Sequence, residues 1–377
     1  MKPRICLDIR PAQTGAKNTG IGAYVRELVK QLLEMESRFD FWFLVLSNYP
    51  IPDLKLSEDR LIKIWLPCKP ERWQVVYDYF ILRRILKKHL IQLFHSLVPG
   101  LLRPGADIKI VTTIYDLIPS IYPDDHINSI DVKLLYDCKM RDSIASDHIV
   151  AISDVTSRDL TRIFNNINTD KITVTSLAAY TGLRRVVEMK REYLNRLGLP
   201  ERYILYVGGY NKRKNIPLLL NAYSALGMKR KNFKLVLAGA AGNYGIASHV
   251  ASLGLQNDVV RLTHIAEEDL SLLYSGAIFF VYPSLYEGFG LPVLEAMTCG
   301  TPVLSSNTGS LVEVAGDAAL YFTPGNEDEL TMLMERVLED SILRDDMRSR
   351  GLNRASLYSW RRCAQETLTV YENVLRA

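Results

Sequence analysis

The sequence predicts an α/β protein made of two domains, each built on a doubly wound parallel sheet. Short apolar segments alternate with amphipathic ones along most of the chain, a pattern that places helices on both faces of a parallel sheet. The chain has 377 residues, more than a single core usually fills. Its two halves also begin alike, with a strand, a glycine-containing loop and a helix. We therefore expect two Rossmann-like domains, with the ligand in a cleft between the carboxyl ends of their strands.

The first half begins with a strand at Ile5–Ile9, where only Asp8 is polar. A polar loop runs from Pro11 to Gly22, and a helix follows in which apolar residues recur every three or four positions. The residues of this apolar face are Val25, Leu28, Val29, Leu32 and Leu33. Further strands are expected near residues 41–46, 61–65, 93–95, 110–114 and 148–152.

The second half begins with a strand at Tyr203–Val207 and a loop at residues 208–214. Asn215 suits the N-cap of the next helix, and Pro217 suits its first turn. Further strands are expected near residues 234–237, 259–262, 277–282, 302–305 and 319–322.

We expect the boundary between the domains near Thr181-Gly182, before a charged helix at residues 184–197. The first domain then spans residues 1–182 and the second residues 183–357. Residues 358–377 form a last helix that begins close to Trp360.

Composition and charge argue against several classes of protein. The net charge of +4 is too small to indicate nucleic-acid binding, and the chain has no long basic run. The five cysteines are scattered and form no Cys-x-x-Cys, which argues against a disulfide framework and a zinc site. No signal peptide opens the chain, and no apolar segment approaches the roughly 20 residues of a membrane-spanning helix. We therefore expect reduced thiols and a cytoplasmic protein.

Two glutamates flank the most informative turn, Glu287-Gly-Phe-Gly-Leu-Pro-Val-Leu-Glu295. An apolar segment at residues 277–282 precedes it, and a helix with Pro292 at its start follows. Its glycines let the backbone approach a ligand, and the N–H groups of the first helical turn favour an anion. Such a pair of acids also arises by chance. With an anion site between them, they suit a ligand with phosphate in the middle and hydroxyls at both ends, such as a nucleotide-sugar.

The surrounding residues resemble a known family. The segment Tyr282–Pro292, followed by Glu295-Ala296, Gly300 and Pro302-Val303, is similar to the signature of retaining glycosyltransferases of family four. The resemblance covers nearly the whole chain and is densest from Tyr203 to Phe322. It implies the GT-B fold, with two Rossmann-like domains facing each other across a cleft. It further implies an acceptor in the first domain, a nucleotide-sugar in the second, and a last helix, 358–377, that crosses back to the first.

The resemblance also implies roles for residues of the second domain. Arg213 and Lys214 would hold the donor diphosphate, together with the helix start at Gly290-Leu291. The spacing of these two cations alone suits a solvated basic loop equally well. Glu295 would bind the ribose, and Glu287 the transferred sugar or the charge that develops at its anomeric carbon. The remaining donor-binding positions are Gly209 and Ile265. His264 stands where relatives have a glycine-containing loop beside the nucleobase.

Fewer positions of the first domain match the family. Gly20-Ile21-Gly22 opens a helix after a strand, which also suits a nicotinamide cofactor, but the third glycine is missing and the loop is long. The resemblance instead implies backbone approach to donor or acceptor. Asp116 matches the aspartate of a common His-Asp pair, but Tyr115 replaces the histidine, so Asp116 would orient the acceptor. His95 is a partial substitute for that histidine or, more simply, a structural residue.

Residues 72–90 allow two interpretations. Their apolar residues fall near helical spacing, and four cations cluster at residues 83–88. The segment is either a core-facing helix with a solvated basic face or a basic amphipathic helix that contacts an anionic membrane. A lipid-linked acceptor would favour the second, at the inner face of the membrane.

The sequence thus predicts a retaining hexosyltransferase of polysaccharide or glycolipid synthesis. The chain has no Asp-x-Asp pair to hold a metal on the diphosphate, so we expect a metal-independent reaction without a cofactor. Family frequency favours UDP-glucose as donor, with GDP-mannose next, and the acceptor is a saccharide or lipid-linked saccharide. The alternatives are a nucleotide-sugar epimerase of the same architecture and a non-catalytic sugar-binding relative.

Overall fold

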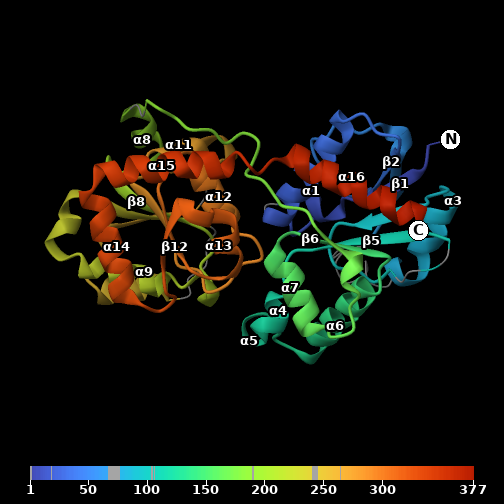
Figure 1. The fold of residues 1–377 in the computed structure, drawn as a ribbon, viewed down its shortest axis with the longest axis horizontal. Coiled ribbons are helices and arrows are strands. Elements are labelled where there is room, and N and C mark those ends of the chain that lie inside the picture. The colour runs from blue at the N-terminus through green and yellow to red at the C-terminus, as the bar shows by residue number, and fades with distance from the viewer. Residues whose placement is uncertain are drawn as a thin grey trace. The chain divides into compact units, whose positions relative to one another are not determined.

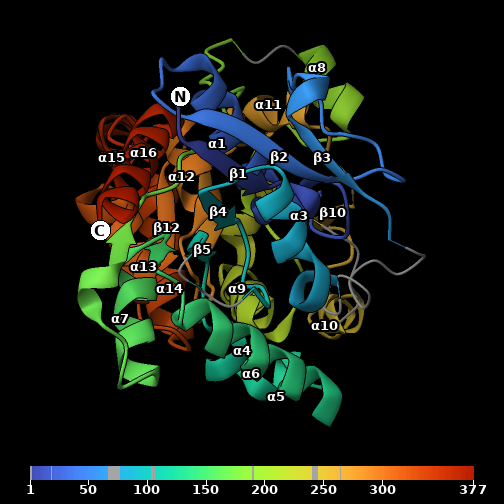
Figure 2. The ribbon, with the colours of Figure 1, turned by 90° about the vertical axis from the view of Figure 1, so that its right-hand side faces the viewer.

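The computed structural model describes residues 2–17, 19–66, 77–102, 105, 107–188, 191–239, 245–263 and 265–377. The chain divides into two compact units, whose helices and strands are drawn in Figure 1. Figure 2 gives a second view of these helices and strands. The first unit comprises Met1–Leu177 and Ser359–Ala377, and the second comprises Ala178–Tyr358.

The first unit contains a seven-stranded parallel sheet in the order β3-β2-β1-β4-β5-β6-β7. Its strands are β1 (Arg4–Asp8), β2 (Asp40–Leu46), β3 (Leu61–Ile64), β4 (Leu93–Ser96), β5 (Lys109–Ile114), β6 (His148–Ala151) and β7 (Ile172–Val174). The sequence missed β7, which has three half-buried residues and no apolar run. The strand order reverses between β1 and β4, and this reversal is where doubly wound sheets bind ligands at their carboxyl edge.

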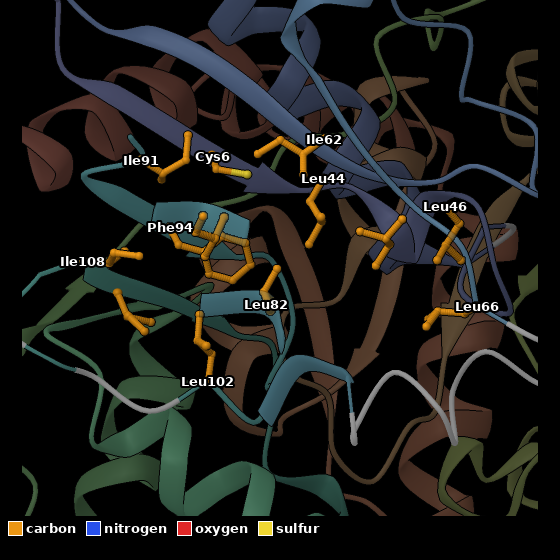
Figure 3. Close-up of a cluster of buried hydrophobic side chains, with 13 residues drawn as sticks. Cys6, Leu44, Leu46, Ile62, Leu66, Leu82, Ile91, Phe94, Leu102 and Ile108 are labelled. Carbon is orange, nitrogen blue, oxygen red and sulfur yellow. The ribbon is translucent and has the colours of Figure 1, made fainter. Parts of the chain in front are cut away.

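Helices cover this sheet on both faces (Figure 1). They are η1 (Arg10–Ala12), α1 (Gly20–Glu34), η2 (Glu58–Arg60), η3 (Asp78–Leu82), α3 (Arg83–Lys88), α4 (Ile118–Ile121), α5 (Pro123–His126), α6 (Ile130–Ile144), α7 (Asp154–Ile163), η4 (Thr169–Lys171) and α16 (Trp360–Arg376). Figure 3 shows part of the core, where Leu82 from η3 joins Cys6 and Phe94 from the sheet. Full burial of a leucine contributes about 2 kcal/mol.

The C-terminal helix α16 packs on α1, β5 and β6 within the first unit. A buried polar chain joins it to the sheet. His95 Nδ1 lies 2.6 Å from Tyr371 Oη of α16, and His95 Nε2 lies 2.9 Å from Thr113 Oγ1. Burial lowers the pKa of His95 to about 3, so its ring is neutral. His95 is therefore a structural residue that links β4, β5 and the last helix.

The second unit contains a six-stranded parallel sheet in the order β10-β9-β8-β11-β12-β13. Its strands are β8 (Tyr203–Val207), β9 (Lys234–Ala238), β10 (Val259–Leu262), β11 (Phe279–Tyr282), β12 (Val303–Ser306) and β13 (Ala319–Phe322). Each lies where the sequence predicts a strand, because these segments are almost continuously apolar. The order reverses between β8 and β11.

Helices also cover this second sheet (Figure 1). They are α8 (Arg191–Leu197), η5 (Lys212–Lys214), α9 (Ile216–Ala225), η6 (Gly227–Asn232), α10 (Ile246–Ser252), η7 (Glu267–Asp269), α11 (Leu270–Ser275), α12 (Leu291–Thr298), α13 (Gly309–Ala315), η8 (Gly316–Ala318), α14 (Glu327–Glu339) and α15 (Ser341–Ala355).

The helix predicted at residues 184–197 is wrong in its first part. Arg184 and Val186 donate their backbone N–H groups to Ser271 Oγ and Ser275 Oγ of α11, at 3.2 and 2.9 Å. These tertiary bonds hold the segment along α11, and the described part of the helix runs from Arg191 to Leu197. The charges of this segment gave no sign of that contact.

The segment at residues 72–90 is described from Tyr77 onward, and residues 72–76 lie outside the described residues. Leu82 and Leu86 face the core, whereas Tyr79, Phe80 and Ile81 are exposed. None of the helices in the described ranges is long and apolar enough to cross a membrane.

The described cysteines all have free thiols, as the sequence predicted. Cys6, Cys299 and Cys363 are buried, and Cys138 is partly exposed. Cys68 lies outside the described residues.

Candidate functional site

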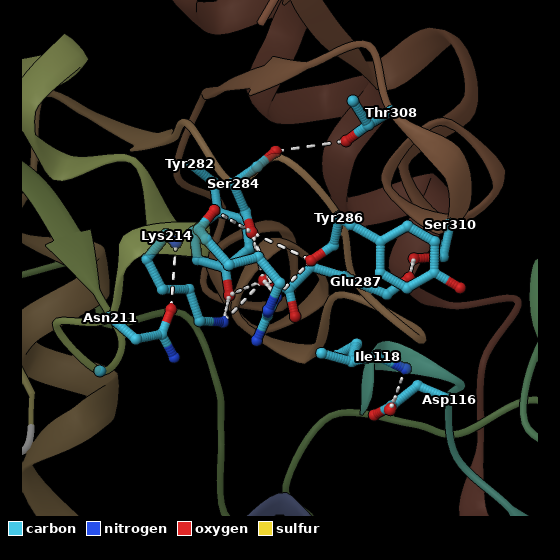
Figure 4. Close-up of polar contacts among 12 residues, drawn as sticks. Asp116, Ile118, Asn211, Lys214, Tyr282, Ser284, Tyr286, Glu287, Thr308 and Ser310 are labelled. Carbon is cyan, nitrogen blue, oxygen red and sulfur yellow. Dashed lines mark hydrogen bonds and ion pairs between the residues drawn. The ribbon is translucent and has the colours of Figure 1, made fainter. Parts of the chain in front are cut away.

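Charged residues gather at the carboxyl edge of the second sheet, where the strand order reverses. Arg213 and Lys214 lie in η5, which follows β8, and Glu287 lies in the loop after β11. The structure thus brings together three residues that the sequence assigned to one site. Figure 4 shows Lys214 and Glu287 of this group.

One oxygen of Glu287 is the centre of this cluster. Glu287 Oε1 lies 2.7 Å from Arg213 Nη1 and 2.6 Å from Lys214 Nζ. It also accepts hydrogen bonds from Ser284 Oγ at 2.5 Å and Tyr282 Oη at 3.1 Å. The other oxygen, Oε2, has no partner among the described residues. The protein therefore holds Glu287 through a single oxygen, Oε1.

Electrostatics keep Glu287 ionised. Its side chain is buried, and burial alone would raise the pKa, but the charges of Lys214 and Arg213 outweigh that effect and lower the pKa below its ordinary value. Two cations face one carboxylate, so the cluster carries one excess positive charge. It is suited to a polyanionic group such as a diphosphate.

The sequence did not single out the two hydroxyl groups of this cluster. Tyr282 is the last residue of β11, and its ring stacks on Tyr206 and on Phe280. Lys214 Nζ donates to Tyr282 Oη at 2.6 Å, and Ser284 also accepts from Arg213 at 3.3 Å. Both residues lie in the segment that resembles the family, but nothing in a linear pattern shows that their hydroxyls meet a carboxylate.

A tight turn fixes the backbone of the two cations. Asn211 caps η5, since its Oδ1 accepts the N–H of Lys214 at 3.1 Å. Asn215 then takes the left-handed conformation, with φ +51°, and α9 begins after it. Asparagine tolerates this conformation better than other side chains. Asn215 occupies the N-cap position of α9, as the sequence predicted, but its side chain makes no capping hydrogen bond, and its role is this change of direction.

Glu295 lies on α12, about one turn from its start. Tyr274 Oη donates to Glu295 Oε2 at 2.8 Å, and Oε1 has no partner among the described residues. Burial raises the pKa of Glu295, and the charge of Glu267 adds to the effect, although the hydrogen bond from Tyr274 opposes it. Like Glu287, Glu295 is therefore held through a single oxygen.

The start of α12 provides backbone donors. Gly290 has φ +106°, and a Cβ there would lie 2.6 Å from Leu311 Cδ2, so both conformation and packing require glycine. Val293 N–H already binds Gly290 O at 3.0 Å, and Pro292 has no N–H. The N–H groups of Gly290 and Leu291 are therefore the donors of this helix start. Ser310 Oγ donates to Glu287 O at 2.8 Å and steadies the loop before it.

Two further predicted residues of the second unit also lie at this edge of the sheet. Gly209 follows β8, and a Cβ on it would meet no atom within 4 Å, so the backbone is open to a ligand. Ile265 lies three residues after β10 and is partly buried. His264 lies outside the described residues.

The predicted residues of the first unit have local roles. Asp116 follows β5, and its Oδ1 accepts the N–H of Ile118, the first residue of α4, at 2.9 Å. Tyr115 donates its hydroxyl to Leu97 O at 2.7 Å and packs edge-on against Tyr24, which makes it part of the core rather than a substitute for a sugar-binding histidine. Gly20 is the first residue of α1 and is exposed.

Gly22 faces its own loop. A Cβ there would lie 2.4 Å from Lys17 O and 2.5 Å from Ala16 O, so the loop of the chain itself occupies the space beside this glycine. Glycine is therefore needed at position 22 for packing, and the predicted approach of its backbone to donor or acceptor stays a prediction.

Comparisons with known proteins agree with this arrangement. Residues 190–354 match the family model described as "Glycosyl transferases group 1". The chain is 32% identical over 378 residues to the O-antigen chain mannosyltransferase B of Escherichia coli, and the alignment covers 94% of this chain and 96% of that protein. The chain belongs to the group 1 glycosyl transferases. It is a glycosyltransferase, as the resemblance of its motifs implied.

Two more relatives extend the comparison. The O-antigen chain mannosyltransferase RfbU of Salmonella typhimurium is 27% identical over 286 residues, which are 73% of this chain and 74% of that protein. The structure of sucrose-phosphate synthase from Thermosynechococcus elongatus matches with a TM-score of 0.76 and 20% identity, over 99% of both chains. The glycosyltransferase therefore has the GT-B fold, with two Rossmann-like domains, as predicted.

Proposed function

We propose that the glycosyltransferase transfers mannose from a nucleoside diphosphate donor to a saccharide or lipid-linked saccharide during polysaccharide synthesis. The names of the two mannosyltransferase relatives support mannose as the transferred sugar. GDP-mannose is accordingly the first donor to test, and UDP-glucose, which the sequence favoured, becomes the second.

The cluster around Glu287 carries this proposal. Arg213 and Lys214 bind the donor diphosphate together with the N–H groups of Gly290 and Leu291, since the cluster has one excess positive charge and a helix start beside it. Glu295 Oε1 accepts the ribose hydroxyls. Glu287 Oε2 accepts hydroxyls of the transferred sugar or stabilises positive charge at its anomeric carbon.

The reaction proceeds with retention of configuration. The bond between the anomeric carbon and the phosphate oxygen breaks, and its electron pair leaves with the diphosphate. The acceptor oxygen bonds to the same face of that carbon, and its proton passes to a phosphate oxygen of the donor. Arg213, Lys214 and the start of α12 stabilise the negative charge of the leaving group, which is the main requirement of such a step. Asp116 orients the acceptor hydroxyl.

An NMR assay of the linkage tests this function. The full chain is incubated with GDP-mannose or UDP-glucose and a panel of methyl glycosides, with and without a chelator. We expect an α-linked product from the α-linked donor and the same rate with the chelator. A β-linked product would make Asp116 the catalytic base of an inverting enzyme, and a requirement for added Mg²⁺ or Mn²⁺ would refute the metal-independent reaction.

The same assay separates the alternatives. An epimerase would convert a nucleotide-sugar without an acceptor, and a non-catalytic relative would bind nucleotide without turnover.

Contact with the membrane through residues 72–90, at the cytoplasmic face, is part of the proposal for a lipid-linked acceptor. The exposed side chains of Tyr79, Phe80 and Ile81 support it. Loss of vesicle binding in a Phe80→Ser, Ile81→Ser variant is the expected result.

A further inference from the structure

Tyr282 places a hydroxyl group between the charged side chains of the cluster in the second unit. Its Oη accepts a hydrogen bond from Lys214 Nζ at 2.6 Å and donates one to Glu287 Oε1 at 3.1 Å. Lys214 Nζ also lies 2.6 Å from the same carboxylate oxygen, so the three polar groups form a closed triangle. Figure 4 shows these three side chains together.

The chemistry of the three groups fixes the direction of each hydrogen bond. An ammonium group only donates and an ionised carboxylate only accepts, so the tyrosine between them accepts from Lys214 and donates to Glu287. Burial, together with the charge of Glu287, raises the pKa of Tyr282, and the phenol therefore keeps its proton. The hydroxyl is thus a neutral link between a cation and an anion.

The ring of Tyr282 is held independently of its hydroxyl. The residue is fully buried at the end of β11, and its ring stacks on Tyr206 and Phe280, with centroids 6.0 and 5.7 Å away. Phenylalanine would make the same stacking contacts, so packing alone does not require the oxygen. Other buried tyrosines of this unit, such as Tyr203 and Tyr223, donate to backbone carbonyls. The hydroxyl of Tyr282 instead meets two charged side chains of the candidate site.

Two acceptors fix the orientation of the Lys214 ammonium group. A lysine ammonium is a point charge on a flexible stem, and it can rotate when a single acceptor holds it. Because Tyr282 Oη and Glu287 Oε1 both accept from it, all three of its N–H directions are set. Arg213 has a rigid guanidinium that also donates to Tyr286 O, so its orientation does not depend on Tyr282.

We propose that Tyr282 is a positioning residue of glycosyl transfer, which acts through Lys214 by fixing the orientation of the ammonium group that stabilises the leaving diphosphate. The proposal rests on the proposed function, because it takes the donor diphosphate as the group that Lys214 binds. Negative charge on the leaving oxygen develops only in the transition state, so a fixed ammonium group lowers the barrier more than it strengthens binding of the intact donor. Loss of the hydroxyl therefore lowers kcat and leaves KM for the donor nearly unchanged.

Steady-state kinetics of Tyr282→Phe measure this split between kcat and KM. We expect kcat to fall about tenfold and the donor KM to change by less than about threefold, because one hydrogen bond to a charged group is lost. Tyr223→Phe is the matched control, since it removes a buried hydroxyl of the same unit that donates to Phe233 O at 3.0 Å instead of to the cluster, and its kcat should equal that of wild type. A raised KM with unchanged kcat in Tyr282→Phe, or an equal fall of kcat in both variants, would overturn the proposal.

A double-mutant cycle with inorganic pyrophosphate tests the link between Tyr282 and Lys214 without turnover. Calorimetry in the presence of a chelator measures pyrophosphate affinity, since this anion carries the full charge of a leaving diphosphate. We expect Tyr282→Phe to weaken binding about fivefold in the wild-type background and less than about twofold in the Lys214→Ala background, because residues that act through one another are not additive. Arg213→Ala is the matched background, in which the loss on Tyr282→Phe should stay about fivefold.

Equal losses in the wild-type and Lys214→Ala backgrounds, no loss in wild type, or no pyrophosphate binding by wild type would each overturn the proposal. If the cycle shows the expected coupling but no hexose is transferred from GDP-mannose or UDP-glucose, the proposed function fails and the link between Tyr282 and Lys214 stands. If hexose is transferred without that coupling, the proposal for Tyr282 fails alone.

Discussion

Lys214 Nζ lies 2.6 Å from Glu287 Oε1, the same oxygen that Arg213 contacts at 2.7 Å. Both cations assigned to the donor diphosphate are therefore paired with a carboxylate before the donor binds. The pairing holds their side chains in place and reduces the charge of the cluster to one positive unit. A diphosphate must share these cations with Glu287. Substitution of Glu287 and substitution of the cations should therefore have different effects on nucleotide binding and on transfer.

Glu287→Gln should lower transfer without weakening the binding of bare nucleoside diphosphate. The amide keeps the shape of the side chain but removes a negative charge beside the phosphates, so the affinity for the nucleotide is retained or increased. Calorimetry with GDP and with UDP measures the nucleotide affinity of the variant and of wild type. A loss of more than about tenfold in nucleotide affinity would mean that Glu287 acts mainly by positioning the two cations.

Arg213→Ala and Lys214→Ala should each slow transfer by about 100-fold, because loss of one group that stabilises developing negative charge costs roughly 3 kcal/mol in the barrier. Lys212→Ala is the matched control, since Lys212 is exposed on the same turn and makes no contact with Glu287. Initial rates of transfer at saturating donor are compared among the three variants. Comparable rates in all three variants would remove both residues from the site.

Asn215→Ala should lower transfer, whereas Asn215→Gly should not. The left-handed conformation at this position costs about 1–2 kcal/mol for an ordinary side chain, and glycine adopts it without penalty. We expect a loss of roughly tenfold in kcat for the alanine variant and recovery in the glycine variant. If both variants lose activity equally, the side chain of Asn215 matters rather than its backbone.

Nucleotide binding should weaken as the pH falls, and the protonation of Glu295 should determine the pH at which the loss of affinity begins. Burial raises the pKa of this carboxyl above its ordinary value, so it takes up a proton at a higher pH than an exposed glutamate and then accepts fewer hydrogen bonds from ribose. Tyr274→Phe removes a hydrogen bond that lowers this pKa, so the decline should begin at a still higher pH.

Glu295→Gln is the control for that experiment, because the phosphates of the ligand titrate identically with either protein. Calorimetric titrations between pH 5 and 8 should show a flatter profile for this variant than for wild type. Parallel profiles in the two proteins would mean that Glu295 does not contact the nucleotide.

His95 should make the stability of the first unit depend on pH. Its pKa is about 3 in the folded chain and about 6.5 when unfolded, so between these values the unfolded chain binds the extra proton. Stability should therefore fall as the pH drops below about 6.5, by up to roughly 1.4 kcal/mol per pH unit. Denaturant titrations at pH 7 and pH 5 measure this change.

The variants Tyr371→Phe and His95→Asn separate the stability that the hydrogen bond provides from the pH dependence of that stability. The first removes the hydroxyl that contacts His95 and keeps the titrating ring, so it should lower stability at every pH and keep the pH dependence. The second should flatten the dependence. If His95→Asn leaves the pH dependence intact, another group, such as the half-buried His148, is responsible.

The sequence determined all but one of the strands and the place of the main candidate residues, because both depend on local patterns. Strands such as Phe279–Tyr282 are continuous apolar runs, and the turn from Glu287 to Glu295 follows one of them directly. Parallel strands align their carboxyl ends, so residues after β8 and β11 had to lie at one edge of the second sheet.

Tertiary structure decided what those residues touch. Ser284 and Tyr282 became partners of Glu287 through the packing of a loop, and His95 bonds to Tyr371 although 276 positions separate them in the chain. Arg10 likewise pairs with Asp78, 68 residues further along the chain, as well as with its neighbour Asp8. Hydrogen bonds between distant segments depend on distances of a few tenths of an ångström, which periodicity and composition do not encode and only the packed chain fixes.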